Sequence, residues 1–99
     1  MKSLNNWIEF GVTDAPSIKE TFLPEPYKEK NDVLKYLKKG KTVLAATEAG
    51  IDYFTNKEVD SKHYIMTDGE YSWDSMLIYY VEKYNAKPDQ EFIAKALKG

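Results

Sequence analysis

The residues of this sequence that could do chemistry are one histidine and a group of carboxylates. The histidine is His63, which could act as a base or bind a metal. The carboxylates, which could hold a hard cation or form an acid–base pair, are Glu58, Asp60, Asp68, Glu70 and Asp74. Their spacing does not fit a calcium loop, and a lone histidine without cysteine disfavours zinc. We therefore expect no metal, no cofactor and no catalytic residue.

Other catalytic motifs are also missing from the sequence. The stretch Gly40–Thr42 reads Gly-Lys-Thr, as in a phosphate-binding loop, but Lys35 stands where that loop needs its first glycine. The chain contains no cysteine, no GxSxG and no HExxH. A non-enzymatic role is therefore expected in preference to an enzymatic one.

Tyr79 is the first candidate for a binding residue. At about 100° per residue, it points away from the apolar stripe centred on Tyr80 and Tyr84, so a one-sided helix would leave its ring in water. Tyrosine is a preferred anchor at protein interfaces. Alternatively, Tyr79 packs against the amino-terminal segment or stacks under Lys83. The other candidates for a binding surface are Asp68, Glu70 and His63.

A β-hairpin over residues 63–73 must position most of these candidates. If Asp68-Gly69 forms a two-residue type I′ turn, the strands that flank it pair residue by residue. The predicted pairs are Thr67–Glu70, Met66–Tyr71, Ile65–Ser72 and Tyr64–Trp73. This register gathers four bulky side chains on one face and leaves His63 on the other.

Three helices are predicted, near residues 31–39, 74–85 and 89–97. The first has Asn31 or Asp32 as its N-cap and Gly40 just beyond its end. The second starts at Ser72 or Asp74 and stops at Asn85. The third starts at Asp89, and its expected buried face consists of Phe92, Ile93, Ala96 and Leu97.

The remaining segments are predicted from alternation and from proline content. The stretch NWIEFGV, residues 6–12, alternates as a half-buried strand does. Residues 13–30 contain three of the four prolines and are expected to be extended or irregular. Residues 42–47 suggest a mostly buried strand, and residues 51–56 a weaker one.

Length and charge limit the classes of function. The 99 residues fit one domain, residues 1–99. The 14 basic and 16 acidic residues give a net charge of −2, which disfavours a nucleic-acid partner. No apolar run has the length of a signal peptide or of a membrane span, so a cytoplasmic location without membrane contact is expected.

These elements predict an α+β fold. It would contain a small, mainly antiparallel sheet with the 63–73 hairpin, covered on one face by the three short helices. The side chains expected to meet in the core are Tyr64, Met66, Tyr71, Trp73, Leu77, Tyr80 and Val81, with Leu34 and Leu37 nearby.

The carboxy-terminal part of the chain resembles a family of small uncharacterised bacterial proteins. The likeness rests on TDGEYSW, YYVEKYN and PDQEFIAKAL, and covers about the last 40 residues. Proteins of this family carry a T-D-G-x-x-x-W element, an aromatic-rich helix and a final helix led by proline. Some are found near toxin systems, so the resemblance implies an immunity-type binding role. It assigns no functional residue, and Asp74 stands where the family often has proline.

Two classes of function follow from the sequence. The first is a protein-binding module, immunity-like or an adaptor, which binds through Tyr79 and the carboxylate-rich end of the hairpin. The second is a small-ligand-binding or hydrolytic domain that uses His63 with Glu70 or Asp60 in a cleft beside the sheet. The partner expected for the first class is another protein, and homodimerisation is a further possibility.

Overall fold

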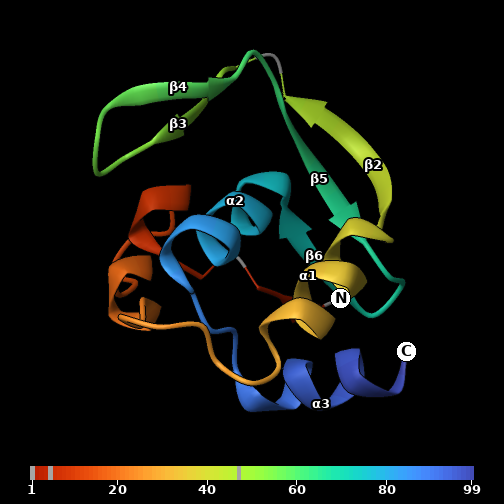
Figure 1. Ribbon diagram of the computed structural model, residues 1–99. Coiled ribbons are helices and arrows are strands. Elements are labelled where there is room, and N and C mark those ends of the chain that lie inside the picture. Colours follow the sequence, from red (N-terminus) through yellow and green to blue (C-terminus); the bar gives the residue numbers. More distant parts are fainter. Residues whose placement is uncertain (1, 5, 47) are drawn as a thin grey trace.

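The computed structural model describes residues 2–4, 6–46 and 48–99, which form two sheets and three α-helices (Figure 1). The larger sheet has the strand order β1-β6-β5-β2, in which β1 and β6 are parallel and the other neighbours antiparallel. Its strands are β1 (Lys2–Ser3), β2 (Lys41–Ala46), β5 (His63–Thr67) and β6 (Tyr71–Asp74). The smaller sheet is the antiparallel pair β3 (Gly50–Asp52) and β4 (Lys57–Asp60).

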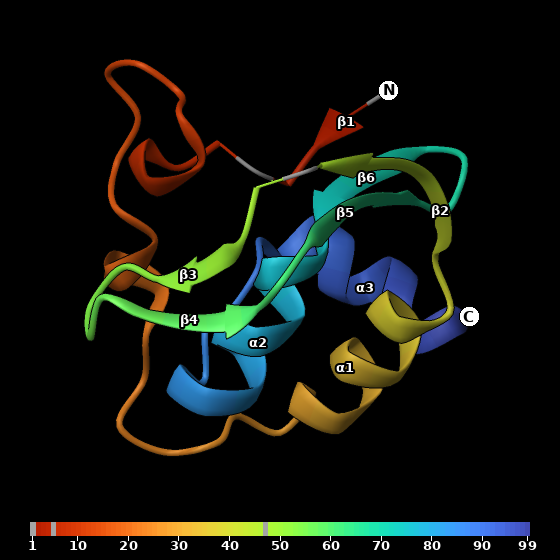
Figure 2. The same ribbon diagram turned by 90° about the horizontal axis from the view of Figure 1, so that it is seen from above.

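The helices lie on one side of the larger sheet (Figure 2). They are α1 (Lys30–Lys38), α2 (Ser75–Tyr84) and α3 (Gln90–Lys98), preceded by two short 3-10 helices, η1 (Ile8–Phe10) and η2 (Ile18–Thr21). The predicted α+β class is confirmed. Buried side chains from all three helices meet β6 in one core, which includes Leu37, Tyr71, Trp73, Leu77, Tyr80, Val81, Phe92 and Ile93. No helix in the described ranges is long and apolar enough to cross a bilayer.

The hairpin is present, but its turn lies one residue later than predicted. The Asp68 amide donates to the Tyr71 carbonyl, so the two central residues are Gly69, at φ 101°, and Glu70. The Asp68 carboxylate accepts the amides of Glu70 and Tyr71 and fixes this turn.

The strand pairs shift as a consequence of the turn. Met66 faces Trp73 and Thr67 faces Ser72, so the predicted register is wrong by two residues. A shift of two keeps each side chain on its predicted face, because the side-chain period of a strand is two. Trp73 and Tyr71 are buried as expected, whereas Met66 and Tyr64 are only half-buried.

The helix signals near the carboxyl end are confirmed. The Asp74 side chain accepts the Met76 amide at the start of α2, which decides between the two predicted caps. Asn85 ends α2 in the left-handed conformation, at φ 58°. Asp89 caps α3 through the Phe92 amide. The expected burial of Leu97 is wrong, because 51% of this side chain is exposed.

The amino-terminal half departs more from the prediction. Glu29, without a side-chain cap, precedes α1 in place of Asn31 or Asp32. Residues 8–10 form the 3-10 helix η1 where a strand was predicted. The reason is a local tie, since the Glu9 carboxylate accepts the Ser17 hydroxyl and the Ile18 amide and folds the chain back.

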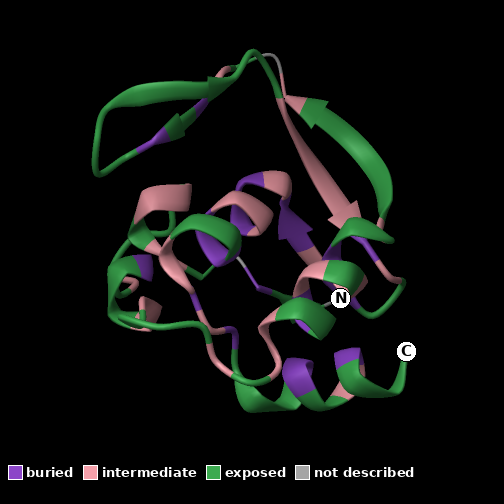
Figure 3. Cartoon of the chain, viewed as in Figure 1, coloured by how far each residue is buried: buried purple, intermediate pink, exposed green. Residues whose placement is uncertain are grey.

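The predicted strand at 42–47 forms as β2, with its last residue outside the described ranges. It is not buried, and Val43 and Leu44 are 58% and 63% exposed. Figure 3 shows the exposed colour along most of β2. Its position explains the difference, because β2 is an edge strand and curves away from the helices (Figure 1). The weaker strand predicted at 51–56 is shorter than expected, since β3 ends at Asp52.

Candidate functional site

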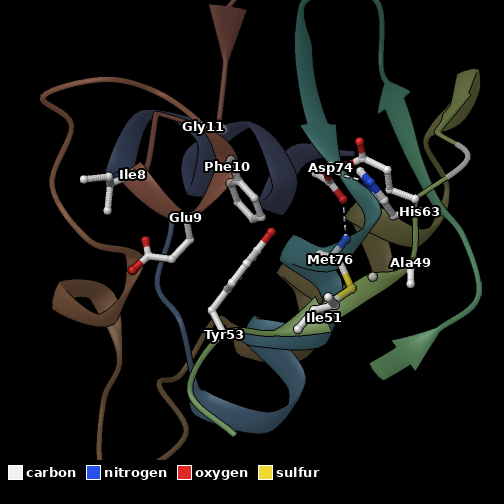
Figure 4. A pocket seen from close by; sticks show the side chains of 12 residues that line it. Ile8, Glu9, Phe10, Gly11, Ala49, Ile51, Tyr53, His63, Asp74 and Met76 are labelled. Carbon is white, nitrogen blue, oxygen red and sulfur yellow. Dashed lines mark hydrogen bonds and ion pairs between the residues drawn. The ribbon is translucent and has the colours of Figure 1, made fainter. Parts of the chain in front are cut away.

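A cleft of about 330 Å³ opens where η1, β3 and the junction of β6 with α2 come together (Figure 4). We call it the η1–β3 cleft. Residues from four separate stretches of the chain line it, and those used below are Ile8, Glu9, Phe10, Glu48, Ile51, Tyr53, His63, Asp74 and Met76. The cleft therefore exists only when the amino-terminal segment and the β3–β4 hairpin both lie against the main sheet.

His63 and Asp74 form an interacting pair in this cleft. His63 Nδ1 lies 2.9 Å from Asp74 Oδ2, and both side chains are largely buried, at 20% and 8% exposed. The other oxygen of Asp74 accepts the Met76 amide at the start of α2. Asp74 pairs with Ile65 across the hairpin, and His63 precedes Ile65 by two residues on the same strand. The His63 side chain is therefore on the same face as Asp74 and within reach of its carboxylate. The hairpin register thus creates the pair.

Aromatic and aliphatic side chains form the walls and rim of the cleft. Phe10 and Tyr53 point toward one another, with Ile51 and Met76 near them (Figure 4). Three lining residues are large, mostly apolar and exposed, namely Ile8 at 55%, Ile51 at 37% and Tyr53 at 50%. The cleft therefore combines an apolar mouth with a polar pair inside it.

The charges at the cleft are negative. Glu9, Glu48 and Asp74 line it, and none of its described lining residues is a lysine or an arginine. Partial burial acts to raise the pKa of Glu9, but the hydrogen bonds from Ser17 and the Ile18 amide hold this pKa below its usual value. Glu9 is therefore charged at neutral pH, although its carboxylate accepts the Ser17 hydroxyl.

The wall formed by β3 is anchored to α2 through Asp52, whose side chain is fully buried. Its Oδ2 accepts the Tyr79 hydroxyl at 2.7 Å and the Tyr84 hydroxyl at 2.6 Å. Its Oδ1 accepts the amides of Phe54 and Thr55. Burial alone would raise the pKa of Asp52, but the hydrogen bonds from the two tyrosines and two amides hold it far below the usual value.

Tyr80 supplies a second anchor between α2 and β3. Its hydroxyl donates to the Ile51 carbonyl at 3.0 Å and accepts the Tyr53 amide at 3.3 Å. Burial raises the pKa of this hydroxyl, which keeps its proton available for donation. The two residues that Tyr80 holds are the same ones that form the rim of the cleft, so the core of α2 determines where that rim stands.

The four predicted binding residues lie in three separate places. His63 lines the cleft, with Asp74 as its partner instead of the predicted Glu70 or Asp60, neither of which lines the cleft. Asp68 and Glu70 lie beyond the opposite end of β5. Tyr79 lies on α2 with its hydroxyl on Asp52. The structure therefore does not bring the predicted set together.

Asp68 and Glu70 belong to the turn of the hairpin and its contact with α3. Asp68 Oδ2 accepts the Tyr36 hydroxyl at 2.5 Å and lies 2.9 Å from Lys95 Nζ. Burial would raise the pKa of Asp68, but the bonds from Tyr36, Tyr71, Lys95 and Glu70 hold it far below the usual value. Glu70 is exposed and also binds Lys95, at 2.7 Å. These contacts give both carboxylates a structural role.

Tyr79 is half-buried, so the expectation that its ring stands in water is wrong. Lys83 does lie over the ring, at 5.7 Å from its centre, as the alternative interpretation proposed. Removal of the hydroxyl in Tyr79→Phe is expected to lower the free energy of unfolding by about 1–3 kcal/mol, because Asp52 loses a hydrogen bond to a buried charge. Urea denaturation measures this change.

The matched control for Tyr79 is Tyr53→Phe. The Tyr53 hydroxyl makes no hydrogen bond to the described residues, and half of this side chain is exposed. Its removal is expected to leave the unfolding curve unchanged. Equal unfolding curves for Tyr79→Phe and the parent protein would show that the bond to Asp52 does not contribute to stability.

Sequence reasoning missed Phe10, Ile51, Tyr53 and Asp52 as parts of the site. One local signal for Asp52 was present in the sequence. Aspartate is common at the start of a turn because its carboxylate accepts amides a few residues later, as Asp52 does with Thr55 ahead of Asn56 in the left-handed conformation. Nothing local to Phe10 indicates that its ring points toward Tyr53 (Figure 4). Comparison of the chain with protein-family models, with curated proteins and with solved structures gave no match in any of the three.

Proposed function

We propose that this protein is a non-enzymatic, cytoplasmic binding module that docks another protein at the η1–β3 cleft, in an immunity-like or adaptor role. The observation that carries the proposal is the gathering of three exposed side chains, Ile8, Ile51 and Tyr53, around one concave site. Exposed apolar groups scattered singly need no explanation, but a cluster of them on a concave surface is typical of an interaction site.

The composition of the cleft also favours a protein partner. Protein interfaces combine aromatic and aliphatic side chains at the centre with a few polar groups that fix the register. Here Phe10, Tyr53 and Ile51 supply the apolar contacts, and the His63–Asp74 pair supplies the polar ones. This surface replaces the one first expected at Tyr79 and the hairpin turn, because the polar groups there are bound within the fold.

A binding role is favoured over catalysis by the chemistry of the lining. None of the described residues that line the cleft is serine, threonine or cysteine. Both oxygens of Asp74 already accept or share hydrogen bonds, one with Met76 and one with His63. Because Asp74 also caps the first turn of α2, the His63–Asp74 pair is held rigidly in place. A rigid pair suits a fixed recognition surface.

Charge substitution on the rim tests the proposal. Ile8→Glu and Ile51→Glu are each expected to weaken capture of a partner from the source cell by at least about tenfold, about 1.4 kcal/mol, because they place a charge in the apolar contact. The measurement is quantitative affinity capture with mass spectrometry, which compares each variant with the parent protein. A captured protein is accepted as the partner only if Ile8→Glu and Ile51→Glu capture less of it than the parent protein does.

Leu97→Glu is the matched control, since Leu97 is about as exposed as Ile8, at 51% against 55%, but lies on α3. It is expected to capture the same partner as the parent protein. Thermal unfolding of all three variants checks that they fold. If every protein captured by the parent is also captured at the same level by both rim variants, the cleft is not the docking site.

The His63–Asp74 pair favours one second candidate function, a small-ligand-binding or hydrolytic domain. Aspartate bound to His63 Nδ1 is an arrangement that fixes the tautomer of an imidazole used as a base. In this case the base would act on a bound water, because the described lining offers no serine, threonine or cysteine for the base to activate. The role would require a small molecule that binds the cleft without any protein partner.

A further inference from the structure

We infer that this protein forms a homodimer in which the β2 strands of two copies pair antiparallel along their free edges. The inference does not depend on the proposed function. It follows from a comparison of the strand edges of the two described sheets. These edges are β1 and β2 in the larger sheet, and β3 and β4 in the smaller one.

An edge strand presents backbone N–H and C=O groups that can pair with a strand of another chain. The edge strands other than β2 are protected against such pairing. β1 has only two residues and begins with Lys2. The edge of β3 is covered by α2, where the Tyr80 hydroxyl donates to the Ile51 carbonyl. Three of the four residues of β4 are charged, namely Lys57, Glu58 and Asp60.

The β2 strand lacks each of these protections. It is six residues long, contains no proline, and has its only charged side chain at its first residue, Lys41. Within the described residues, its backbone pairs with β5 and makes no hydrogen bond to any other segment. Figure 1 shows β2 on the outer side of the larger sheet, with β5 between it and β6. Its outer edge is therefore open to a further strand.

The side chains of β2 also favour a contact. Val43 and Leu44 are the two most exposed of the large apolar side chains in the described residues. The β2–β5 register shifts between Thr42 and Leu44, and it is regular from Leu44 to Ala46. The regular stretch is where a second strand is expected to pair. In an antiparallel pair centred on Ala45, Leu44 of each copy lies opposite Ala46 of the other and is partly removed from water.

Charge indicates that the added strand is the β2 of a second copy. An antiparallel pair places the start of one β2 beside the end of the other, so Lys41 of each copy comes close to Glu48 of the other. Both side chains are exposed, and neither has a bonding partner among the described residues. The opposite charges attract each other. A parallel pair would instead place the two copies of Lys41 side by side. The antiparallel pair is also closed by a twofold axis, which stops the assembly at two copies.

Sedimentation equilibrium tests the dimer. We expect a dissociation constant on the order of 0.1 mM, because the contact is smaller than the standard interface of about 1,600 Å². Leu44→Lys should raise this constant at least about tenfold, since lysine on an edge strand opposes pairing. Val59→Lys, at an exposed aliphatic residue of β4, is the matched control and should leave it unchanged. Circular dichroism checks that both variants fold.

An exchange of charges tests the orientation of the two strands. Lys41→Glu is expected to weaken the dimer several-fold, because the new carboxylate lies close to Glu48 of the other copy. The double variant with Lys41→Glu and Glu48→Lys should dimerise about as well as the parent protein. If the double variant dimerises no better than Lys41→Glu alone, the antiparallel arrangement is wrong.

A cysteine crosslink tests the position of the contact. The chain contains no cysteine, so Ala45→Cys supplies the only thiol. In the pair centred on Ala45, the two Cα atoms at this position lie about 4.5–5.5 Å apart, within the range of a disulfide. Mild oxidation should therefore give a covalent dimer much faster than it does for Val59→Cys.

Two outcomes would overturn the inference outright. One is equal crosslinking of Ala45→Cys and Val59→Cys, which would show that the copies do not meet at β2. The other is a parent protein that stays monomeric up to about 1 mM, tenfold above the expected dissociation constant. The second outcome rejects the homodimer whether or not a strand of a different protein pairs with β2.

Discussion

Asp52→Ala is expected to lower the free energy of unfolding by on the order of 3 kcal/mol, because four donors lose a shared buried acceptor. The hydroxyls of Tyr79 and Tyr84 and the amides of Phe54 and Thr55 all bond to this carboxylate. Water cannot replace it fully, since the Asp52 side chain is completely buried. Chemical denaturation of the two proteins measures the difference.

The effect of Asp52 should also depend on pH. Its folded-state pKa lies below the usual value, so the stability it contributes is fully present above the unfolded pKa of about 3.9 and is lost as pH falls toward the folded pKa. The gap in stability between the parent protein and Asp52→Ala should therefore be constant near neutral pH and shrink below about pH 4. Asp60→Ala, at an exposed position on β4, is the control.

A contrary result would change the account of the cleft. If the gap keeps its full size down to the lowest pH at which both proteins fold, the charge of Asp52 does not hold β3 against α2. The position of Ile51 and Tyr53 would then depend on Tyr80 and on packing alone.

The second large effect is expected at Trp73, which is fully buried between β6 and the helices. Trp73→Ala should cost about 3–5 kcal/mol, because it removes apolar surface and leaves a cavity beside Phe92 and Tyr36. The total free energy of unfolding of a small domain is roughly 5–15 kcal/mol, so the variant should unfold at a much lower denaturant concentration. Equilibrium denaturation followed by circular dichroism measures the change.

Gly40 provides a sharper test of the same packing. A Cβ atom at Gly40 would overlap the Trp73 indole, and Gly40 does not have a positive φ. Glycine is therefore needed for space and not for backbone conformation. Gly40→Ala should lower the free energy of unfolding by about 1–3 kcal/mol in the parent protein. The decrease should be clearly smaller in a Trp73→Phe background, because phenylalanine has one ring where the indole has two. Equal costs in both backgrounds would show that the two residues are not coupled.

The sequence determined the parts of this protein that depend on neighbouring residues. Asp74, Asn85 and Asp89 mark helix ends through bonds to amides or through a local left-handed conformation. The alternation of the hairpin placed Tyr71 and Trp73 on the buried face even though the turn moved by one residue. Such signals act over two to four residues, and a shift of two in the register leaves the faces unchanged.

Only the tertiary structure decided the site. Asp52 meets Tyr79 and Tyr84 across 27 and 32 residues of chain, and His63 meets Asp74 across 11. Phe10 faces Tyr53 because Glu9 binds Ser17 and turns a predicted strand into a short helix. Which carboxylate meets which hydroxyl depends on how the hairpins and α2 pack, and many different packings satisfy the same local pattern. The sequence names the groups, but packing selects which of them meet.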